Sequence, residues 1–317
     1  MQNTALRGWY KIIRLLGSGG FGETYLAEDR DLPNRPICVV KRLQPKSNSP
    51  AVLQVAKRLF NSEAEVLYRL GNYDQIPRLL AHFEEDQQFY LVQEFIRGHD
   101  LSKELIAGKR WTEAQVIEFL EDILKTLEFV HQQKVIHRDI KPANLIRRKQ
   151  DEKIILIDFG AVKEIETLVA NTQGNTHSTI AVGTPGYMPN EQQGGKPRFS
   201  SDIYAAGMVA IQALTGVSPE QLPEDTTTGE IIWRQQAQVN DRLAAILDRM
   251  VRSHFRDRYH SVGEVLNDLY SLHTRTATFV SVQTRQQSSA TNIQSQAPQQ
   301  PVASNVKYLI RINYINK

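Results

Sequence analysis

A short polar segment in the middle of the chain carries residue types suited to phosphate chemistry. Residues 137–144 (HRDIKPAN) hold a histidine, an arginine, an aspartate, a lysine and an asparagine between apolar flanks. Pro142 prevents this segment from continuing as a helix, so we expect a loop to present the polar groups. Fourteen residues after Asn144, Asp158 ends an apolar strand. Asparagine and aspartate oxygens are the ligands that Mg²⁺ accepts when it is shared with phosphate groups.

A glycine-rich segment near the start of the chain, residues 17–22 (GSGGFG), has three alternative interpretations. It could be a dinucleotide-binding turn, a hairpin that covers phosphates, or a flexible loop. A dinucleotide site needs a helix directly after the glycines, whereas residues 23–27 (ETYLA) are β-like. The pattern therefore favours a strand–turn–strand whose backbone N–H groups close over phosphate oxygens. A Walker-type phosphate loop is excluded because no Gly-Lys-Ser/Thr follows.

Lys41 closes an apolar strand (CVVK) and is the candidate phosphate-binding cation. An isolated lysine at this kind of position usually points into water. The functional alternative has its ammonium reaching inward to phosphates, held by a carboxylate from the helix that follows. Glu63 is the best candidate for that carboxylate. Glu65 competes with it but points about 200° round the helix, so only one of the two can face the strand.

The elements that must position these residues fall into two groups. Up to residue 98 the pattern predicts one helix, over 51–70, and strands over 9–16, 23–28, 37–43, 79–83 and 89–95. From residue 100 onward helices dominate, over 112–130, 201–214, 243–250 and 262–272. Thr112 has the signature of an N-cap. Residues 201–214 are almost all apolar but too few to span a bilayer, so they predict a buried core helix.

Composition excludes several classes of protein. The 317 residues predict roughly two domains. The single cysteine, Cys38, excludes a disulfide scaffold and a cysteine-cluster metal site, and predicts a reducing, cytoplasmic setting. No apolar run approaches the ~18 residues of a membrane span. The first ten residues also lack the apolar core of a secretory signal. We therefore expect no transmembrane segment.

The C-terminal part differs from the body in charge and in composition. The chain has 38 basic and 35 acidic residues, and beyond residue 272 it has five basic residues and no acidic one. Residues 1–272 therefore sum to −2, so we expect no nucleic-acid binding by the folded part. Gln, Ser and Thr fill 14 of the 24 positions 281–304, which predicts a disordered linker over 273–305. Residues 306–317 form a short apolar and basic segment to which we assign no role.

Taken together, the motifs resemble a eukaryotic-type (Hanks-type) serine/threonine protein kinase domain of the bacterial branch, over residues 9–272. They stand in that family's order: Gly17, Gly19 and Gly22, then Lys41, Glu63, His137-Arg138-Asp139, Lys141, Asn144, Asp158-Phe159-Gly160 and Gly183-Thr184-Pro185-Gly186-Tyr187-Met188. The resemblance implies a bilobal α+β fold. Its N-lobe, about 9–97, is small and β-rich with one main helix, and its C-lobe, about 98–272, is larger and mostly helical.

The resemblance also implies roles for single residues. Asp139 would orient the acceptor hydroxyl and take its proton, and Lys141 would neutralise charge on the transferred phosphate. Lys41, paired with Glu63, would hold the α- and β-phosphates of ATP. Two residues would bind Mg²⁺ or Mn²⁺, namely Asn144 and Asp158. The loop that would cover the phosphates consists of Gly17, Ser18, Gly19, Gly20, Phe21 and Gly22.

The adenine pocket implied by the resemblance departs in places from the family pattern. Its walls would be Thr24 and Val39 on one side and Ile146 on the other, against the hinge Glu94-Phe95-Ile96, with Asp100 near the ribose or the substrate. Thr24 replaces the usual valine, Val39 replaces the usual alanine, and the pocket-gating position is the polar Gln93. The family's Ala-Pro-Glu reads Pro189-Asn190-Glu191.

Several features of the resemblance concern selectivity and regulation. Lys141-Pro142 and Gly183-Thr184-Pro185 are similar to serine/threonine kinases, not to tyrosine kinases. Arg138 could pair with a phosphate on the loop between Asp158 and Glu191, and the candidate acceptors are Thr176, Ser178 and Thr179. Autophosphorylation there would involve self-association. Two contacts would be structural, an ion pair between Glu191 and Arg258 and the bracing of the His-Arg-Asp backbone by Asp202.

Three functional hypotheses follow. The first is an active serine/threonine kinase that phosphorylates proteins in signal transduction. The second is a pseudokinase scaffold, whose usual mark is a substitution at Lys41, Asp139, Asn144 or Asp158, and none is seen. The third is a small-molecule kinase of related fold. It is disfavoured by the long segment from Asp158 to Glu191, which resembles a platform for a peptide.

Overall fold

The computed structural model describes residues 5–19, 22–43, 50–159 and 184–273. The chain divides into two units, Met1–His273 and Thr274–Lys317. Predictions that lie outside the described residues concern Gly20, Phe21, Gly160, Gly183 and the three candidate phosphate acceptors Thr176, Ser178 and Thr179. The predicted linker, apart from His273, and the C-terminal segment 306–317 lie outside them too.

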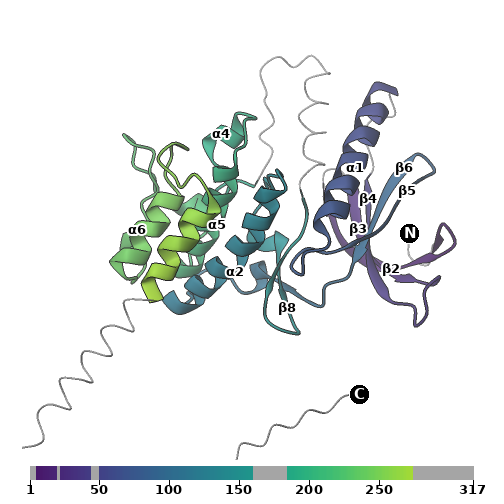
Figure 1. Ribbon diagram of the computed structural model, residues 1–317, viewed down its shortest axis with the longest axis horizontal. Helices are drawn as coiled ribbons and strands as arrows, with labels where there is room; N and C mark the ends of the chain where they lie inside the picture. Colours follow the sequence, from purple (N-terminus) through teal and green to yellow (C-terminus); the bar gives the residue numbers. More distant parts are fainter. Residues whose placement is uncertain (1–4, 20–21, 44–49, 160–183, 274–317) are drawn as a thin grey trace, which may run out of the picture. The chain divides into compact units, whose positions relative to one another are not determined.

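The N-terminal lobe is built on one six-stranded antiparallel sheet with the order β1-β2-β3-β4-β6-β5 (Figure 1). Its strands are β1 (Ala5–Leu6), β2 (Tyr10–Gly19), β3 (Gly22–Asp29), β4 (Ile37–Leu43), β5 (Leu79–Glu85) and β6 (Gln88–Glu94). The five predicted strands are confirmed within a few residues. Each contains apolar residues and β-formers bounded by polar, glycine or proline positions, which is the pattern on which the prediction rests.

The two faces of this sheet bury different sets of residues. Val40 and Val92 belong to a cluster with Ile12 and Tyr25 on one face. On the other face Leu91 packs into the large core of the molecule. That core includes residues of helix α1 (Pro50–Leu70), which contacts β5 and β6 and lies beside the sheet in Figure 1. Alternate residues of β4 and β6 therefore point to opposite sides, as the pleat requires.

The C-terminal lobe is mostly helical. Its helices are α2 (Glu113–Gln132), α4 (Asn190–Gln193), α5 (Phe199–Thr215), α6 (Asp241–Met250) and a helix over 262–273. Thr112 caps α2 as predicted: its Oγ1 accepts from the Gln115 N–H (3.3 Å), and Gln115 Oε1 accepts from the Thr112 N–H (2.9 Å). The predicted division into a β-rich lobe with one main helix and a larger helical lobe is confirmed.

Helix α5 is the central element of this lobe. It contacts both α2 and α6 (Figure 1), and nearly all of its side chains are buried, as its apolar sequence predicted. Gly216 ends the helix with φ +69°. A side chain there would bring a Cβ within 3.0 Å of the backbone of Gly108 and Lys109, so both the conformation and the space require glycine.

A second, three-stranded sheet carries the segments around the polar loop. Its antiparallel strands are β7 (Gly98–Asp100), β8 (Leu145–Arg148) and β9 (Ile154–Leu156). Short 3-10 helices cover Leu101–Lys103, Pro142–Asn144, Pro219–Gln221 and Arg234–Gln236. Strands of this length have too few residues to show a period of two, and β7 and β8 were not predicted. In the described part of the chain, none of the helices has the length and apolarity to cross a membrane.

Candidate active site

Asp139 lies in the loop between α2 and β8 and is buried. Its Oδ2 is 3.0 Å from Lys141 Nζ and accepts a hydrogen bond from Asn144 Nδ2 at 2.8 Å. Pro142 starts the 3-10 helix that carries Asn144 back toward Asp139, which explains how residues so close in sequence meet. The loop thus brings together one carboxylate, one ammonium and one amide, all predicted as site residues.

Thr184, at the start of the described stretch 184–273, also contacts this group. Its Oγ1 donates to Asp139 Oδ1 at 3.2 Å and accepts from Lys141 Nζ at 2.8 Å. The sequence placed Thr184 in a motif but gave it no contact with Asp139. Nothing in the local pattern reveals this contact, because the two residues are separated by 45 positions.

The Asn144 amide is turned with its nitrogen toward Asp139. Its Nδ2 donates both to the Asp139 carbonyl (2.8 Å) and to the Asp139 carboxylate (2.8 Å). The amide oxygen is thereby left for a cation. The Asn144 carbonyl accepts from the Ile157 N–H at 3.0 Å, which ties the loop to the residue before Asp158. The described residues include no cluster of three or more His, Cys, Asp or Glu that could hold a metal ion alone. Two oxygen donors fit a Mg²⁺ or Mn²⁺ ion that takes its other ligands from phosphate and water.

Lys41 forms an ion pair with Asp158, with Nζ 3.0 Å from Oδ1. The predicted ion pair between Lys41 and Glu63 is not formed, since no hydrogen bond or ion pair between these two described residues is present. Glu63 is nevertheless buried, with 2% of its surface exposed, and its Oε1 has no hydrogen-bond partner among the described residues. The chain therefore holds Lys41 near two carboxylates but in contact with one.

The pKa values of Glu63 and Lys41 are both shifted by this arrangement. Burial raises the pKa of Glu63 to about 7, although the Lys41 charge opposes the shift. Burial alone would lower the pKa of Lys41, but the carboxylates of Asp158 and Glu63 raise it above its ordinary value. Lys41 thus keeps its charge at neutral pH, while Glu63 exchanges a proton close to neutrality.

Asp158 adopts a conformation that few non-glycine residues take, with φ +69°. Phe159, the next residue, is buried and its ring packs edge-on against the His137 ring, with centroids 4.8 Å apart. A backbone conformation that costs of order 1–3 kcal/mol persists only where the surroundings hold it. The buried Phe159 supplies part of that hold, and the Asp158 carboxylate contacts Lys41.

His137 is neutral and has one defined tautomer. Its Nε2–H donates to the Ile157 carbonyl (3.1 Å), and its Nδ1 accepts from the Asp139 N–H (3.3 Å). Burial lowers the pKa of His137, with the Asp202 and Asp139 carboxylates opposing the shift. A proton on Nδ1 would remove the acceptor of the Asp139 N–H. His137 therefore helps to fix the backbone at Asp139.

Asp202 on α5 holds the loop of Asp139 through hydrogen bonds. Its Oδ2 accepts from the His137 N–H (2.9 Å) and from His131 Nε2 (2.8 Å), and its Oδ1 accepts from the Arg138 N–H (2.9 Å). Burial alone would raise the pKa of Asp202, but the hydrogen bond and charge of His131 bring it below its ordinary value. The carboxylate lies where the sequence analysis placed it.

Glu191 and Arg258 form a buried two-point ion pair, with Nη1–Oε1 at 2.6 Å and Nη2–Oε2 at 3.1 Å. Ser201 Oγ also donates to Glu191 at 2.7 Å. Arg258 also donates to the carbonyls of Arg252, Ser253 and Ser200. Helix α4 is thereby fixed to the helical lobe, and the Pro189-Asn190-Glu191 sequence keeps the glutamate contact despite the shifted proline.

Strand register places the predicted adenine-pocket residues of the N-lobe on one face of the sheet. Residues directly opposite each other in an antiparallel pair point to the same side. Lys41 is opposite Thr24 and Val39 is opposite Gln93. Because Lys41 and Val39 are two residues apart on β4, all four lie on the face that carries the Lys41–Asp158 ion pair. Gln93 is 5% exposed and lies opposite Val39.

The other predicted nucleotide-site residues lie at the start of β3, in the second sheet, and at and just after the end of β6. Gly22 starts β3 so close to β4 that a Cβ would lie 1.9 Å from the Arg42 carbonyl oxygen, so no other residue fits. Ile146 pairs with Asp100 and Ile155 in the second sheet. The Glu94 side chain is bonded to Arg78, with Nε–Oε2 at 3.1 Å. The hinge residue Ile96 follows β6.

Comparison with known proteins decides the family. The family model "Protein kinase domain" matches residues 10–285. "Serine/threonine-protein kinase B" of Synechocystis sp. is 48% identical over 267 residues, and "Serine/threonine-protein kinase PknA" of Nostoc sp. is 47% identical over 262 residues. The chain is a member of the Hanks-type serine/threonine protein kinases. The matches cover 83% and 82% of this chain but 46% of each relative, so the kinase spans about half the length of these curated relatives.

Solved structures agree on the fold. The crystal structure of the PknI kinase domain of Mycobacterium tuberculosis superposes with a TM-score of 0.61 at 23% identity, over 86% of this chain and 98% of that one. This likeness concerns the fold alone. It accounts for the two lobes and for the order of their strands and helices.

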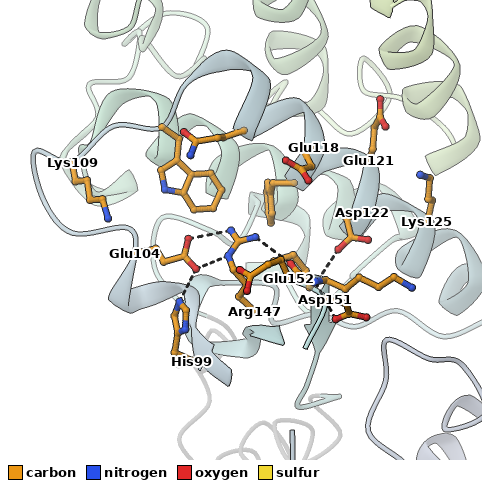
Figure 2. Close-up of a pocket in the computed structure, with 15 residues that line it drawn as sticks. His99, Glu104, Lys109, Glu118, Glu121, Asp122, Lys125, Arg147, Asp151 and Glu152 are labelled. Carbon is orange, nitrogen blue, oxygen red and sulfur yellow. Dashed lines mark hydrogen bonds and ion pairs between the residues drawn. The ribbon is translucent and has the colours of Figure 1, made fainter. Parts of the chain in front are cut away.

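A cavity of about 640 Å³ on the C-lobe of the kinase has none of the predicted site residues in its lining (Figure 2). It is lined by side chains of α2, of the β7–β8–β9 sheet with its β8–β9 turn, and of the segment that precedes α2, and several of its charges pair with one another. Glu104 binds Arg147 (2.6 and 3.1 Å) and His99 (2.8 Å), and Asp122 accepts from the Ile154 N–H (2.6 Å). The Asp122 contact fastens the second sheet to α2, and the Glu104 contacts fasten it to the segment after the 3-10 helix Leu101–Lys103. We do not assign this cavity as the active site, because none of the predicted catalytic or metal-binding residues lines it.

Proposed function

We propose that this chain transfers the γ-phosphate of ATP to serine and threonine hydroxyls of proteins, with Mg²⁺ or Mn²⁺ as the cation. The observation that carries the proposal is the contact of Asp139 with Lys141, Asn144 and Thr184. Lys141 and Thr184 contact the Asp139 carboxylate, and Asn144, which also donates to it, accepts through its carbonyl from the N–H of Ile157, the residue before Asp158. Phosphoryl transfer requires this kind of charge neutralisation and positioning more than covalent catalysis by the protein.

In this proposal each residue has one task. Asp139 accepts the proton of the substrate hydroxyl as its oxygen bonds to the γ-phosphorus and the bond to the ADP oxygen breaks. Lys141 stabilises negative charge on the transferred group. A bound Mg²⁺ or Mn²⁺ neutralises phosphate charge. Asn144 and Asp158 hold that cation, and Lys41 binds the α- and β-phosphates.

The nucleotide itself would lie against the face of the sheet described above. Thr24 and Val39 from the N-lobe and Ile146 from the second sheet would enclose the adenine. The hinge, Glu94 to Ile96, would supply backbone hydrogen bonds, and Asp100 would reach the ribose or the substrate. The glycines of residues 17–22 would cover the phosphates with backbone N–H groups.

Incubation with radiolabelled ATP and Mg²⁺ tests this function. We expect the wild type to label a generic basic protein or itself and Asp139→Asn to lose that labelling, because an amide cannot accept the proton. Asn preserves the size of the side chain, so nucleotide binding should persist. Equal labelling by both proteins would overturn the assignment of Asp139.

A pseudokinase scaffold is the alternative function. The chain retains every residue that would handle phosphate or metal, which favours an active enzyme. A scaffold would bind nucleotide or a partner protein without labelling any substrate. Absence of labelling from a folded, nucleotide-binding wild type would therefore establish this alternative.

We further propose that the kinase phosphorylates itself between Asp158 and Glu191, through a transient self-association, and acts in cytoplasmic signalling. Arg138, directly before Asp139, could receive such a phosphate. The candidate acceptors are Thr176, Ser178 and Thr179. Mass spectrometry after incubation with Mg-ATP should find phosphate between Asn171 and Thr184, and none there would contradict the proposal. Cell fractionation would test the location.

A further inference from the structure

Helix α4 supplies one buried side chain to the loop that carries Asp139. Gln192 is 6% exposed, and its Nε2 donates to the Arg138 carbonyl oxygen at 2.6 Å. The residue follows Glu191 directly, yet the sequence pattern gave it no role. The bond joins α4 to the residue directly before Asp139, 54 positions earlier in the sequence.

The acceptor of this bond is a backbone position under constraint. Arg138 has φ +69°, in the left-handed region that non-glycine residues avoid. Its N–H donates to Asp202 Oδ1 on α5 at 2.9 Å. The peptide groups on both sides of Arg138 are therefore held, one by α5 and the other by α4.

The held carbonyl belongs to the same planar unit as the Asp139 N–H, because a peptide bond does not rotate freely. That N–H donates to His137 Nδ1 at 3.3 Å. The peptide group between Arg138 and Asp139 is therefore fixed at both ends, its C=O by Gln192 and its N–H by His137. The Asp139 side chain is attached directly after this peptide group. Rotation of this unit would move the carboxylate away from Lys141 and Asn144.

Helix α4, which carries Gln192, is itself held in place by other contacts. Glu191, the neighbour of Gln192, is fixed by the ion pair with Arg258. At the start of the same described stretch, Thr184 contacts the Asp139 and Lys141 side chains. Residues 184–192 thus touch the loop twice, once at the carboxylate and once at the backbone.

We propose that Gln192 is a positioning residue that sets the orientation of the Asp139 carboxylate through the Arg138 carbonyl. The inference rests on the proposed function, because it needs Asp139 to act on the substrate hydroxyl. Through this bond a shift of α4, which follows the predicted phosphorylation loop, would move the backbone next to Asp139.

The main test is Gln192→Met, which keeps the length of the side chain and removes the donor. We expect kcat to fall about 10- to 100-fold, because a misplacement near 1 Å costs on the order of 10²-fold in rate. KM for ATP, the dissociation constant for Mg-ATP and the melting temperature should stay close to wild type. The matched control is Gln193→Met on the same helix, whose exposed amide donates to the Met188 carbonyl at 3.3 Å. It should keep wild-type kcat.

A second variant, Gln192→Glu, guards against a packing effect of methionine. It keeps the shape of glutamine but turns an oxygen toward the carbonyl oxygen of Arg138, so kcat should fall at least as far as in Gln192→Met. Wild-type kcat in both variants would overturn the inference. So would a fall in kcat that is matched by equal losses of nucleotide binding and melting temperature, because that result shows a structural role only.

Asp139→Asn, measured in the same assays, separates this inference from the proposed function. If Asp139→Asn is inactive and the Gln192 variants are fully active, the inference fails and the proposed function stands. If Asp139→Asn retains wild-type activity, the proposed function fails and the inference fails with it.

Discussion

Lys41 and Asp158 are joined by an ion pair, with Nζ 3.0 Å from Oδ1, that links β4 to the residues after β9. Glu63 on α1 is buried beside the same ammonium without contacting it. A divalent cation would attract the Asp158 carboxylate, and phosphates would attract the ammonium. We therefore expect the Lys41–Asp158 contact to open when Mg-ATP binds, and Glu63 to become the carboxylate that holds Lys41.

Glu63 gives the nucleotide-free protein a distinctive dependence of stability on pH. Burial raises its pKa from 4.5 to about 7, so the folded state binds more protons than the unfolded state in that window. Its contribution to stability is therefore fully present below pH 4.5 and is lost as pH rises through about 7. Glu63→Gln should match wild type at low pH and be more stable at pH 8, by a few kcal/mol at most, at about 1.4 kcal/mol per pKa unit.

Unfolding by urea at several pH values, without nucleotide, measures this difference. The variant and the wild type should converge as pH falls toward 5. Stability curves that run parallel from acid to alkaline pH would show that Glu63 does not titrate in this window. Mg-ATP should reduce the difference, because Lys41 released from Asp158 would then stabilise the Glu63 carboxylate.

Lys41→Met should abolish most phosphoryl transfer and weaken ATP binding by about tenfold or more, since a charged hydrogen bond contributes about 1.5–3 kcal/mol. Lys57→Met is the matched control, because Lys57 lies on α1 and pairs at the surface with Glu84 at 2.7 Å. Fluorescence titration with Mg-ATP and labelling of a substrate protein measure the two effects. Wild-type turnover in Lys41→Met would mean that another residue holds the phosphates.

Long periodic segments made most of the fold predictable from the sequence. The helices α2 and α5 were predicted with nearly correct bounds, because an N-cap at Thr112 and an apolar run from residue 201 are local signals. The strands β7 and β8 and the four-residue α4 were missed. Such short elements are stabilised by contacts with distant residues, so their own sequence carries little information.

The site was predictable where its residues are neighbours in sequence. Asp139, Lys141 and Asn144 meet because one loop and one turn of 3-10 helix carry them. The partner of Lys41 could not be predicted in the same way. Spacing on the helix selected Glu63, but the contact depends on how far α1 lies from β4, which is a property of packing. The contacts of Thr184 and Gln192 with the loop of Asp139 were missed for a similar reason, because their partners lie 45 and 54 residues away.

Thr184→Val should lower kcat by about 10- to 100-fold while leaving the affinity for ATP unchanged. The valine removes the hydroxyl that donates to Asp139 and accepts from Lys141, and hydrogen bonds to charged groups contribute about 1.5–3 kcal/mol. Thr184→Ser retains the hydroxyl and should keep most of the activity. Steady-state kinetics with a peptide substrate separate kcat from KM. Equal activity of the valine and serine variants would contradict a role for the hydroxyl.

Arg258→Met should destabilise the folded protein by about 3–5 kcal/mol, because it leaves the buried Glu191 carboxylate without its cation. Burial alone would raise the pKa of Glu191, but the hydrogen bonds and charge of Arg258 and the Ser201 hydroxyl lower it below 4.5. The ion pair's contribution is thus present above pH 4.5 and is lost as pH falls below it, so the difference between variant and wild type should shrink in acid. Urea unfolding at pH 7 and pH 4 measures both values. The double variant Arg258→Met, Glu191→Met removes the stranded charge and should recover part of the stability. No recovery would mean that the loss arises from packing around Arg258, not from an unpaired carboxylate.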